Sequence, residues 1–182
     1  MFSAQVDEWT DAELAAANTA VNVSYLDTIE KEAIKYLNLA RLYPQKYLKL
    51  ELNSYKGPKG YLEVAKNDPY RRSLERTLKK QKPLQAVESD SLLYLTAKCL
   101  VKEQGKTRRT GHTRIRCKDD YVAECISYGM HSGKEIVMQL LIDKGVRSLG
   151  HRKICLDEEL KLVGVKHGSH KKNETMSVLD FK

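Results

Sequence analysis

Histidine is the side chain best suited to bind a metal ion or to transfer a proton near neutral pH, and this chain has five histidines, at positions 112, 131, 151, 167 and 170. No two of them are spaced as His-x-x-x-His, and none lies in a His-Glu-x-x-His motif, so a zincin-type site is excluded. His112 and His151 each follow a glycine, in Gly111-His112-Thr113 and Gly150-His151-Arg152. Such positions favour a surface cleft over a core, although either residue taken alone is more often an ordinary surface histidine.

Glu124 interrupts an otherwise apolar run, Val122-Ala123-Glu124-Cys125-Ile126. A carboxylate on a half-buried strand needs a partner, because leaving it desolvated and unpaired costs roughly several kcal/mol. An imidazole would serve as that partner. The alternative, that Glu124 faces solvent, stays open on the sequence alone.

Three helices are predicted around these residues. The first covers residues 28–43, where Asp27 and Glu30 form a capping-box pattern and Pro44 ends the helix. The second covers residues 90–103, with one apolar face formed by Leu92, Leu93, Thr96, Cys99 and Leu100. The third covers residues 134–143 and directs Ile136, Val137, Leu140 and Leu141 inward.

Strand-like patterns occur mainly near the end of the chain. A short strand is predicted over residues 121–127, and the pattern of residues 161–170 and 174–181 predicts an antiparallel hairpin. Between the second helix and the first strand, residues 105–118 are polar and cationic and predict a loop that carries His112. Helices that precede paired strands point to the α+β class.

Composition limits the classes of protein that this chain can represent. At about 150 residues per domain, its 182 residues fit one domain, or one domain plus an appendage. With 41% apolar and 31% charged residues and a net charge of +8, it is neither a disordered polar tail nor a membrane-embedded bundle. No run approaches the roughly 18 apolar residues of a spanning helix. Residues 1–7 show no export signal.

Four cysteines, Cys99, Cys117, Cys125 and Cys155, allow three complete disulfide pairings, and the sequence does not choose among them. The absence of Cys-x-x-Cys argues against a zinc finger or a thioredoxin-type site.

The order and spacing of several motifs resemble the CAP superfamily (cysteine-rich secretory proteins, antigen 5 and pathogenesis-related proteins; SCP domain), most of all its bacterial secreted branch. The early helix carries Asn38, Arg41 and Pro44, and further motifs follow in order: Gly111-His112-Thr113, Glu124 with Ser127-Tyr128-Gly129, the helix from Glu135 to Asp143, Gly150-His151-Arg152-Lys153 and Val163-Gly164-Val165. The resemblance spans about residues 30–181, with residues 49–89 poorly covered. We therefore expect an N-terminal arm over residues 1–26 and a single CAP/SCP-like domain over residues 27–182.

This resemblance implies an α-β-α sandwich, with a central antiparallel sheet between helix layers and a cleft that holds two histidines and two acids. The histidines are His112 and His151, and the first acid is Glu124. The second acid is Asp143. Strict alignment with the family places this acid at Lys144, which is one helical step of about 100° from Asp143. An alternative alignment with the family uses His131-Ser132-Gly133 and Glu135. It aligns the helix that follows and His151 less well than the alignment through Glu124. The family has an asparagine where this chain has Cys125.

The resemblance also implies a secreted or periplasmic protein whose leader is absent from this sequence, with a cleft that binds a ligand and no established catalysis. His112 and His151 are the candidate ligands for zinc or another divalent ion. The cationic loop would disfavour a cation unless its basic side chains turn outward, and would favour an anionic ligand. Two alternatives stay open: a metal-dependent hydrolase, possibly a peptidase, that uses the same cleft, and a surface interaction or adhesion module.

Several partner classes follow from these observations. The ligand is expected to be a small molecule, a lipid or an anionic polymer, and we expect a monomer without a transmembrane segment. The basic segments at residues 70–80 and 108–118 carry no recognised nucleic-acid motif, so no nucleic-acid partner is predicted.

Overall fold

The computed structural model describes residues 8–58 and 65–182. Its elements follow in the order α1 (Asp11–Ala17), α2 (Thr28–Leu42), α3 (Pro44–Tyr47), the π-helical turn η1 (Leu48–Leu52), α4 (Pro69–Lys80), β1 (Glu88–Ser89), α5 (Ser91–Gly105), β2 (Ala123–Tyr128), α6 (Gly133–Ile142), α7 (Gly150–Cys155), β3 (Leu162–His170) and β4 (Glu174–Phe181). Helices come first and paired strands last, so the α+β prediction is confirmed.

The strands form one sheet in the order β1-β3-β4-β2. The β3–β4 and β4–β2 pairs are antiparallel, and the two-residue strand β1 pairs with β3 in parallel. Within the described residues β2 is therefore an edge strand. Its register places Glu124 opposite Asp180 of β4, so two acids lie on the same face of neighbouring strands.

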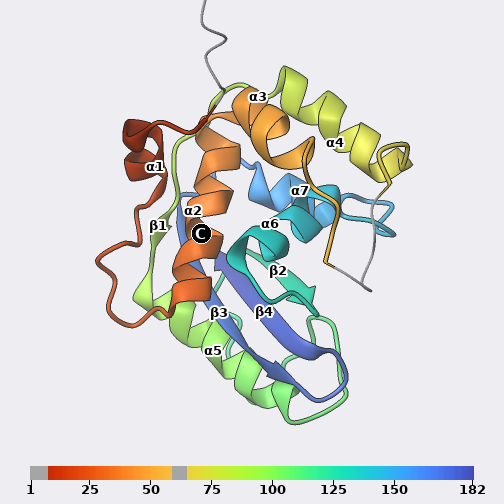
Figure 1. The fold of residues 1–182 in the computed structure, drawn as a ribbon. Coiled ribbons are helices and arrows are strands. Elements are labelled where there is room, and N and C mark those ends of the chain that lie inside the picture. The colour runs from red at the N-terminus through yellow and green to blue at the C-terminus, as the bar shows by residue number, and fades with distance from the viewer. Residues whose placement is uncertain (1–7, 59–64) are drawn as a thin grey trace, which may run out of the picture.

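Helices cover both faces of this sheet (Figure 1). On one face, α5 packs its residues Ala97, Leu100 and Val101 against the even-numbered strand residues Ile126, Met176 and Val178. On the other face, the odd-numbered strand residues Cys125, Val163, Val165, Leu179 and Phe181 join the larger core formed with α2 and α6. The alternation of the strands thus produces the expected layering of helices on either side of a sheet.

Most predicted elements are confirmed, with two corrections. Helix α2 begins at Thr28 behind an Asp27–Glu30 capping box, and the hairpin and α6 lie within a residue or two of their predicted bounds. Leu92 was expected on the apolar face of α5 but is 64% exposed. Tyr94, Ala97 and Val101 are buried instead, because the helix is rotated so that the stripe next to Leu92 faces the sheet. Helix α4 was not predicted, because its few apolar residues are interspersed with arginines and lysines.

The described part of the predicted N-terminal arm, residues 8–26, lies against the body of the protein. Ala17, Ala20 and Leu26 are buried in the main core, and Asn38 of α2 donates hydrogen bonds to the carbonyls of Ala17 and Val87. Residues 1–7 of that arm lie outside the described residues. No helix in the described ranges is long and apolar enough to cross a membrane.

We predict that Gly164→Ala destabilises the fold by about 1–3 kcal/mol. A Cβ at Gly164 would lie 2.1 Å from the backbone carbon of Leu93 and 2.1 Å from the nitrogen of Tyr94, so α5 would have to move away from the sheet. The free energy of unfolding in urea measures the effect. Gly150→Ala is the control, because its Cβ would meet only the Ser148 hydroxyl at 3.5 Å. Equal unfolding midpoints for wild type and Gly164→Ala would contradict the close packing of α5 on β3.

Candidate functional site

The structure brings the four residues selected from the sequence together at the edge strand β2. Glu124 lies on β2, His112 on the loop before it, Asp143 directly after α6, and His151 in the first turn of α7. The imidazole rings of His112 and His151 have centroids 6.4 Å apart and are tilted by 31°. Each ring contacts its own carboxylate: the Nδ1–oxygen distance is 2.7 Å both for His112–Glu124 and for His151–Asp143.

The loop that carries His112 is held on both sides by hydrogen bonds. The Gln104 side chain of α5 donates to the carbonyl of Gly111 at 2.7 Å, and the amide of Gly111 donates to the Tyr128 hydroxyl of β2 at 2.8 Å. Gly111 has φ +91°, a conformation that residues with a Cβ rarely adopt. This turn directs His112 toward Glu124.

Asp143 ends α6 and also binds the first turn of α7. It adopts a left-handed conformation, φ 58°, which terminates the helix. Its Oδ2 accepts hydrogen bonds from the backbone amides of His151 and Arg152 at 3.0 and 3.3 Å, while Oδ1 contacts the His151 ring. Lys144, where strict alignment with the family places this acid, points elsewhere and pairs with Asp68 at 2.9 Å. Asp143 is therefore the acid that lies at the site.

Glu124 is buried and pairs with two basic side chains. Besides His112, its second carboxylate oxygen pairs with the Arg114 guanidinium. Arg114 also pairs with Asp180 at 3.0 Å, and Asp180 accepts a hydrogen bond from Thr96 of α5 at 2.6 Å. The sequence-based suggestion that Glu124 pairs with an imidazole is confirmed, and the solvent-facing alternative is wrong.

These contacts set the protonation of the buried groups. Burial would raise the pKa of Glu124, but the hydrogen bond from His112 and the charge of Arg114 outweigh it and hold that pKa below its usual range. Burial raises the pKa of Asp180 to about 7 despite Thr96 and Arg114. The pKa of His112 is raised, chiefly by its hydrogen bond to Glu124. The network therefore favours an ionised Glu124 next to an imidazole that is easily protonated.

Both imidazoles keep Nε2 without a protein partner among the described residues, because each uses Nδ1 for its carboxylate. Metal-binding histidines typically donate one ring N–H to a carboxylate and coordinate through the other nitrogen. Each ring therefore has the same arrangement, with Nδ1 on a carboxylate and Nε2 left for another partner. The described residues contain no cluster of three or more histidine, cysteine or acidic side chains suited to a metal, so a divalent ion at the two rings would take its remaining ligands from water or from a bound molecule.

The basic residues near His112 do not all bear on the site. Lys106, Arg108, Arg116 and Lys118 are exposed, and Arg109 pairs with Glu103 at 2.7 Å. Arg114 turns inward, where its charge is balanced by Glu124 and Asp180. Most of the basic side chains thus turn outward, which is the condition under which the loop does not disfavour a cation beside His112.

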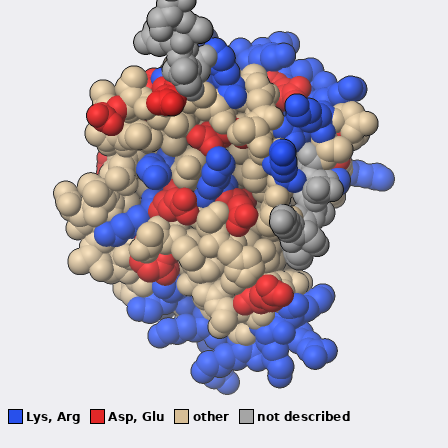
Figure 2. Space-filling model, viewed as in Figure 1, with Lys and Arg blue, Asp and Glu red and all other residues tan. Residues whose placement is uncertain are grey.

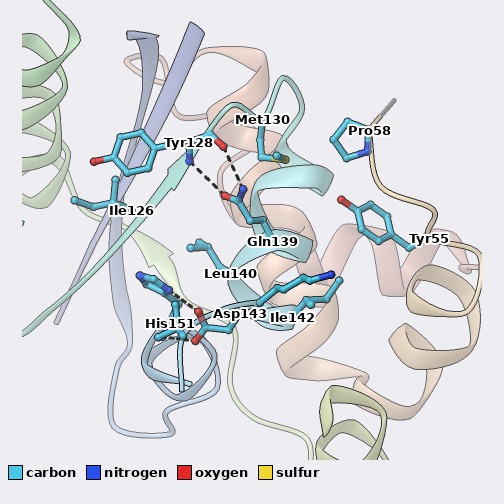
Figure 3. Close-up of a pocket in the computed structure, with 12 residues that line it drawn as sticks. Tyr55, Pro58, Ile126, Tyr128, Met130, Gln139, Leu140, Ile142, Asp143 and His151 are labelled. Carbon is cyan, nitrogen blue, oxygen red and sulfur yellow. Dashed lines mark hydrogen bonds and ion pairs between the residues drawn. The ribbon is translucent and has the colours of Figure 1, made fainter. Parts of the chain in front are cut away.

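An apolar cavity of about 250 Å³ adjoins the site (Figure 3). Its lining includes Met130, Leu140 and Ile142, and His151 and Asp143 border it. Tyr55 and Pro58 lie across the cavity from the Gln139 side chain of α6 (Figure 3). No local pattern in the sequence indicated this cavity, because its walls come from segments far apart along the chain.

Two residues of the site, Arg114 and Asp180, were not predicted from the sequence. Arg114 was counted only as one of several loop cations. Asp180 lies in the apolar run Val178-Leu179-Asp180-Phe181, the same pattern that singled out Glu124, and that pattern could have identified it. Of the residues in the alternative alignment, His131 lies elsewhere and pairs with Glu174, and Ser132 caps α6.

Comparison with known proteins gives little guidance. No protein-family model matches the chain, and no curated protein matches it. Among solved structures, the chain is similar to an outer surface protein from Borrelia burgdorferi, with 19% sequence identity and a TM-score of 0.43 over 62% of this chain and 88% of that one. A likeness at this level assigns neither a fold nor a function.

We predict that Glu124→Gln lowers the pKa of His112, because the substitution removes the charge and weakens the hydrogen bond that raise it. NMR titration of the His112 ring protons measures this value. In the wild type, the raised pKa means that the pair adds stability that is complete below the ordinary histidine value of 6.5 and is lost as pH rises through the raised value. The stability difference between wild type and Glu124→Gln should therefore shrink over that pH range.

Glu174→Gln is the matched control, because Glu174 has the same charge but pairs with His131 on the surface. The pKa of His112 should not change in that variant. An unchanged His112 pKa in folded Glu124→Gln would show that the pair seen in the structure does not form in solution.

Proposed function

We propose that this chain is a secreted CAP-domain protein whose cleft binds a ligand through the paired imidazoles of His112 and His151, with zinc or another divalent ion as the best-matched ligand. The observation that carries the proposal is that two carboxylate-oriented imidazoles lie 6.4 Å apart, each with Nε2 free of protein partners in the described structure. The Glu124 carboxylate, ionised beside Arg114, and the Asp143 carboxylate orient the two rings as carboxylates orient metal-binding histidines.

Binding is favoured over catalysis because no nucleophile is arranged at the site among the residues that the structure describes. The Ser127 hydroxyl donates to Gln139 at 2.5 Å, and the Ser132 hydroxyl caps α6, so neither serine contacts His112 or His151. A divalent ion held by the two histidines would act as a Lewis acid toward a carbonyl or phosphoryl oxygen. This keeps the metal-dependent hydrolase, possibly a peptidase, as the enzymatic alternative.

A secreted or periplasmic location is part of this proposal. Its support is the disulfide between Cys99 of α5 and Cys117 of the loop that carries His112. Disulfides persist in oxidising compartments and are rare in the cytosol.

We predict that Zn²⁺ titrated into the metal-free protein binds at one site, and that His112→Ala and His151→Ala each weaken binding at least about tenfold. Isothermal titration calorimetry gives both the stoichiometry and the affinity. His131→Ala is the control, because the His131 side chain is 57% exposed, as is that of His112, but lies away from the cleft. Absence of Zn²⁺ binding to the wild type, or an equal loss in His131→Ala, would remove the metal from the proposal.

A second candidate function, docking to an anionic polymer, is favoured by a cluster of cations at one end of the molecule. The turn between β3 and β4 lies against the loop after α5: the amide of Lys171 donates to the carbonyl of Gly105 at 2.9 Å, and Nε2 of His170 donates to that of Arg109 at 2.8 Å. Figure 2 shows basic side chains gathered over this end. We call it the basic tip, consisting of Lys102, Lys106, Arg108, Lys171 and Lys172, all exposed and without an acidic partner among the described residues.

We predict that the wild type binds a sulfated polysaccharide with an affinity that falls steeply with salt, because screening weakens contacts between exposed charges. Replacing both Lys171 and Lys172 by Gln should lower the salt concentration needed for elution from a heparin column. The control replaces Lys79 and Lys80 of α4, two exposed neighbouring lysines, by Gln. Equal shifts in the two double variants would assign retention to net charge rather than to the basic tip.

A further inference from the structure

Two buried thiols lie directly behind the candidate site. Cys125 of β2 follows Glu124 in the chain, and Cys155 is the last residue of α7, which begins with the turn that carries His151. Both side chains are fully buried. The Cys125 thiol donates a hydrogen bond to the carbonyl oxygen of His151 at 3.7 Å, one helical turn before Cys155. Residues one helical turn apart lie on the same side of a helix, so Cys155 is a neighbour of Cys125 in the core where α7 packs on β2.

The other two cysteines are already paired. Cys99 and Cys117 form a disulfide that ties the His112 loop to α5. Of the three pairings that the sequence left open, this bond leaves only one partner for Cys125 and one for Cys155. Neither thiol takes part in a metal cluster within the described residues.

We propose that Cys125 and Cys155 form a second disulfide under oxidising conditions, joining β2 covalently to α7. The bond would connect the strand that carries Glu124 to the helix that carries His151, and so fix the two halves of the cleft relative to each other. This proposal does not depend on metal or polymer binding at the sites described above.

The oxidant is a low-molecular-weight disulfide such as oxidised glutathione. One cysteine, as the thiolate, attacks the small disulfide, forms a mixed disulfide and releases one small thiol. The second cysteine attacks the protein sulfur of that mixed disulfide and releases the second small thiol. Two electrons pass from the cysteines to the oxidant, and the two thiol protons end on the released thiols.

Burial controls how fast this exchange proceeds. Both thiols are fully buried, so a small disulfide does not reach them in the native protein. Oxidation must therefore follow a local opening of α7 or occur during folding. Once formed, the bond restricts the unfolded chain between residues 125 and 155 and stabilises the native state.

The test compares reduced protein refolded in a reduced–oxidised glutathione buffer with native protein incubated in the same buffer. After an acid quench, free thiols are alkylated under denaturing conditions and the tryptic peptides are identified by mass spectrometry. We expect a cross-linked pair of peptides that carry Cys125 and Cys155, and a higher urea midpoint than for protein in which only Cys99 and Cys117 are bonded. Native protein should reach the same product more slowly.

Two variants make the result specific. Cys125→Ser should leave Cys155 alkylated or glutathionylated and should abolish the increase in urea midpoint. The double variant Cys99→Ser with Cys117→Ser should still give the Cys125–Cys155 peptide pair. If refolded wild-type protein contains the Cys99–Cys117 bond but both other cysteines are fully alkylated, the proposal is overturned.

Discussion

The candidate site depends on the position of α7, a six-residue helix that is too short to be stable by itself. Two buried side chains fix it. The Asp143 carboxylate accepts hydrogen bonds from two of its first amides, and the guanidinium of Arg152 donates to the carbonyls of Leu141 and Ile142, at the end of α6, and to the carbonyl of Tyr70 in α4. These bonds satisfy helix ends that would otherwise be buried without partners. Asp143 therefore both anchors α7 and orients the His151 ring, so a change that displaces this carboxylate would disturb the helix and the site together.

The other half of the site depends on a balance of buried charge. Glu124 and Asp180 lie on neighbouring strands, and Arg114 reaches both from the loop that carries His112. Removing Arg114 would leave two carboxylates close together in a buried position, which is strongly unfavourable. The side chain of Arg114 thus holds the loop to the sheet and keeps Glu124 available to His112. The aromatic ring of Tyr121, 4.6 Å from the guanidinium carbon, covers the pair.

Local signals in the sequence predicted the longer helices α2, α5 and α6, the strand β2 and the hairpin, but not α4 or α7 and not the contacts between elements. Capping at Asp27, the hairpin and the need of Glu124 for a partner each follow from a few adjacent residues. The rotation of α5 was mispredicted at Leu92, because an apolar stripe with two neighbouring leucines does not specify which of them faces the sheet. The choice between Asp143 and Lys144 required the left-handed turn at the end of α6. Arg114, Asp180 and the apolar cavity depend on residues that only the tertiary structure brings together.

The two separate carboxylate–imidazole pairs favour ligand binding over acid–base catalysis at the candidate site. A general acid–base pair requires a nucleophile or a water molecule placed between groups of different proton affinity, whereas here each imidazole is oriented by its own acid and presents the same nitrogen. Such symmetry suits a shared ligand bound between the rings. His151 also borders the apolar cavity, and His112 does not line it. Under the proposed function, an apolar portion of a bound molecule would therefore lie on the side of His151, which borders the cavity, rather than on the side of the more exposed His112.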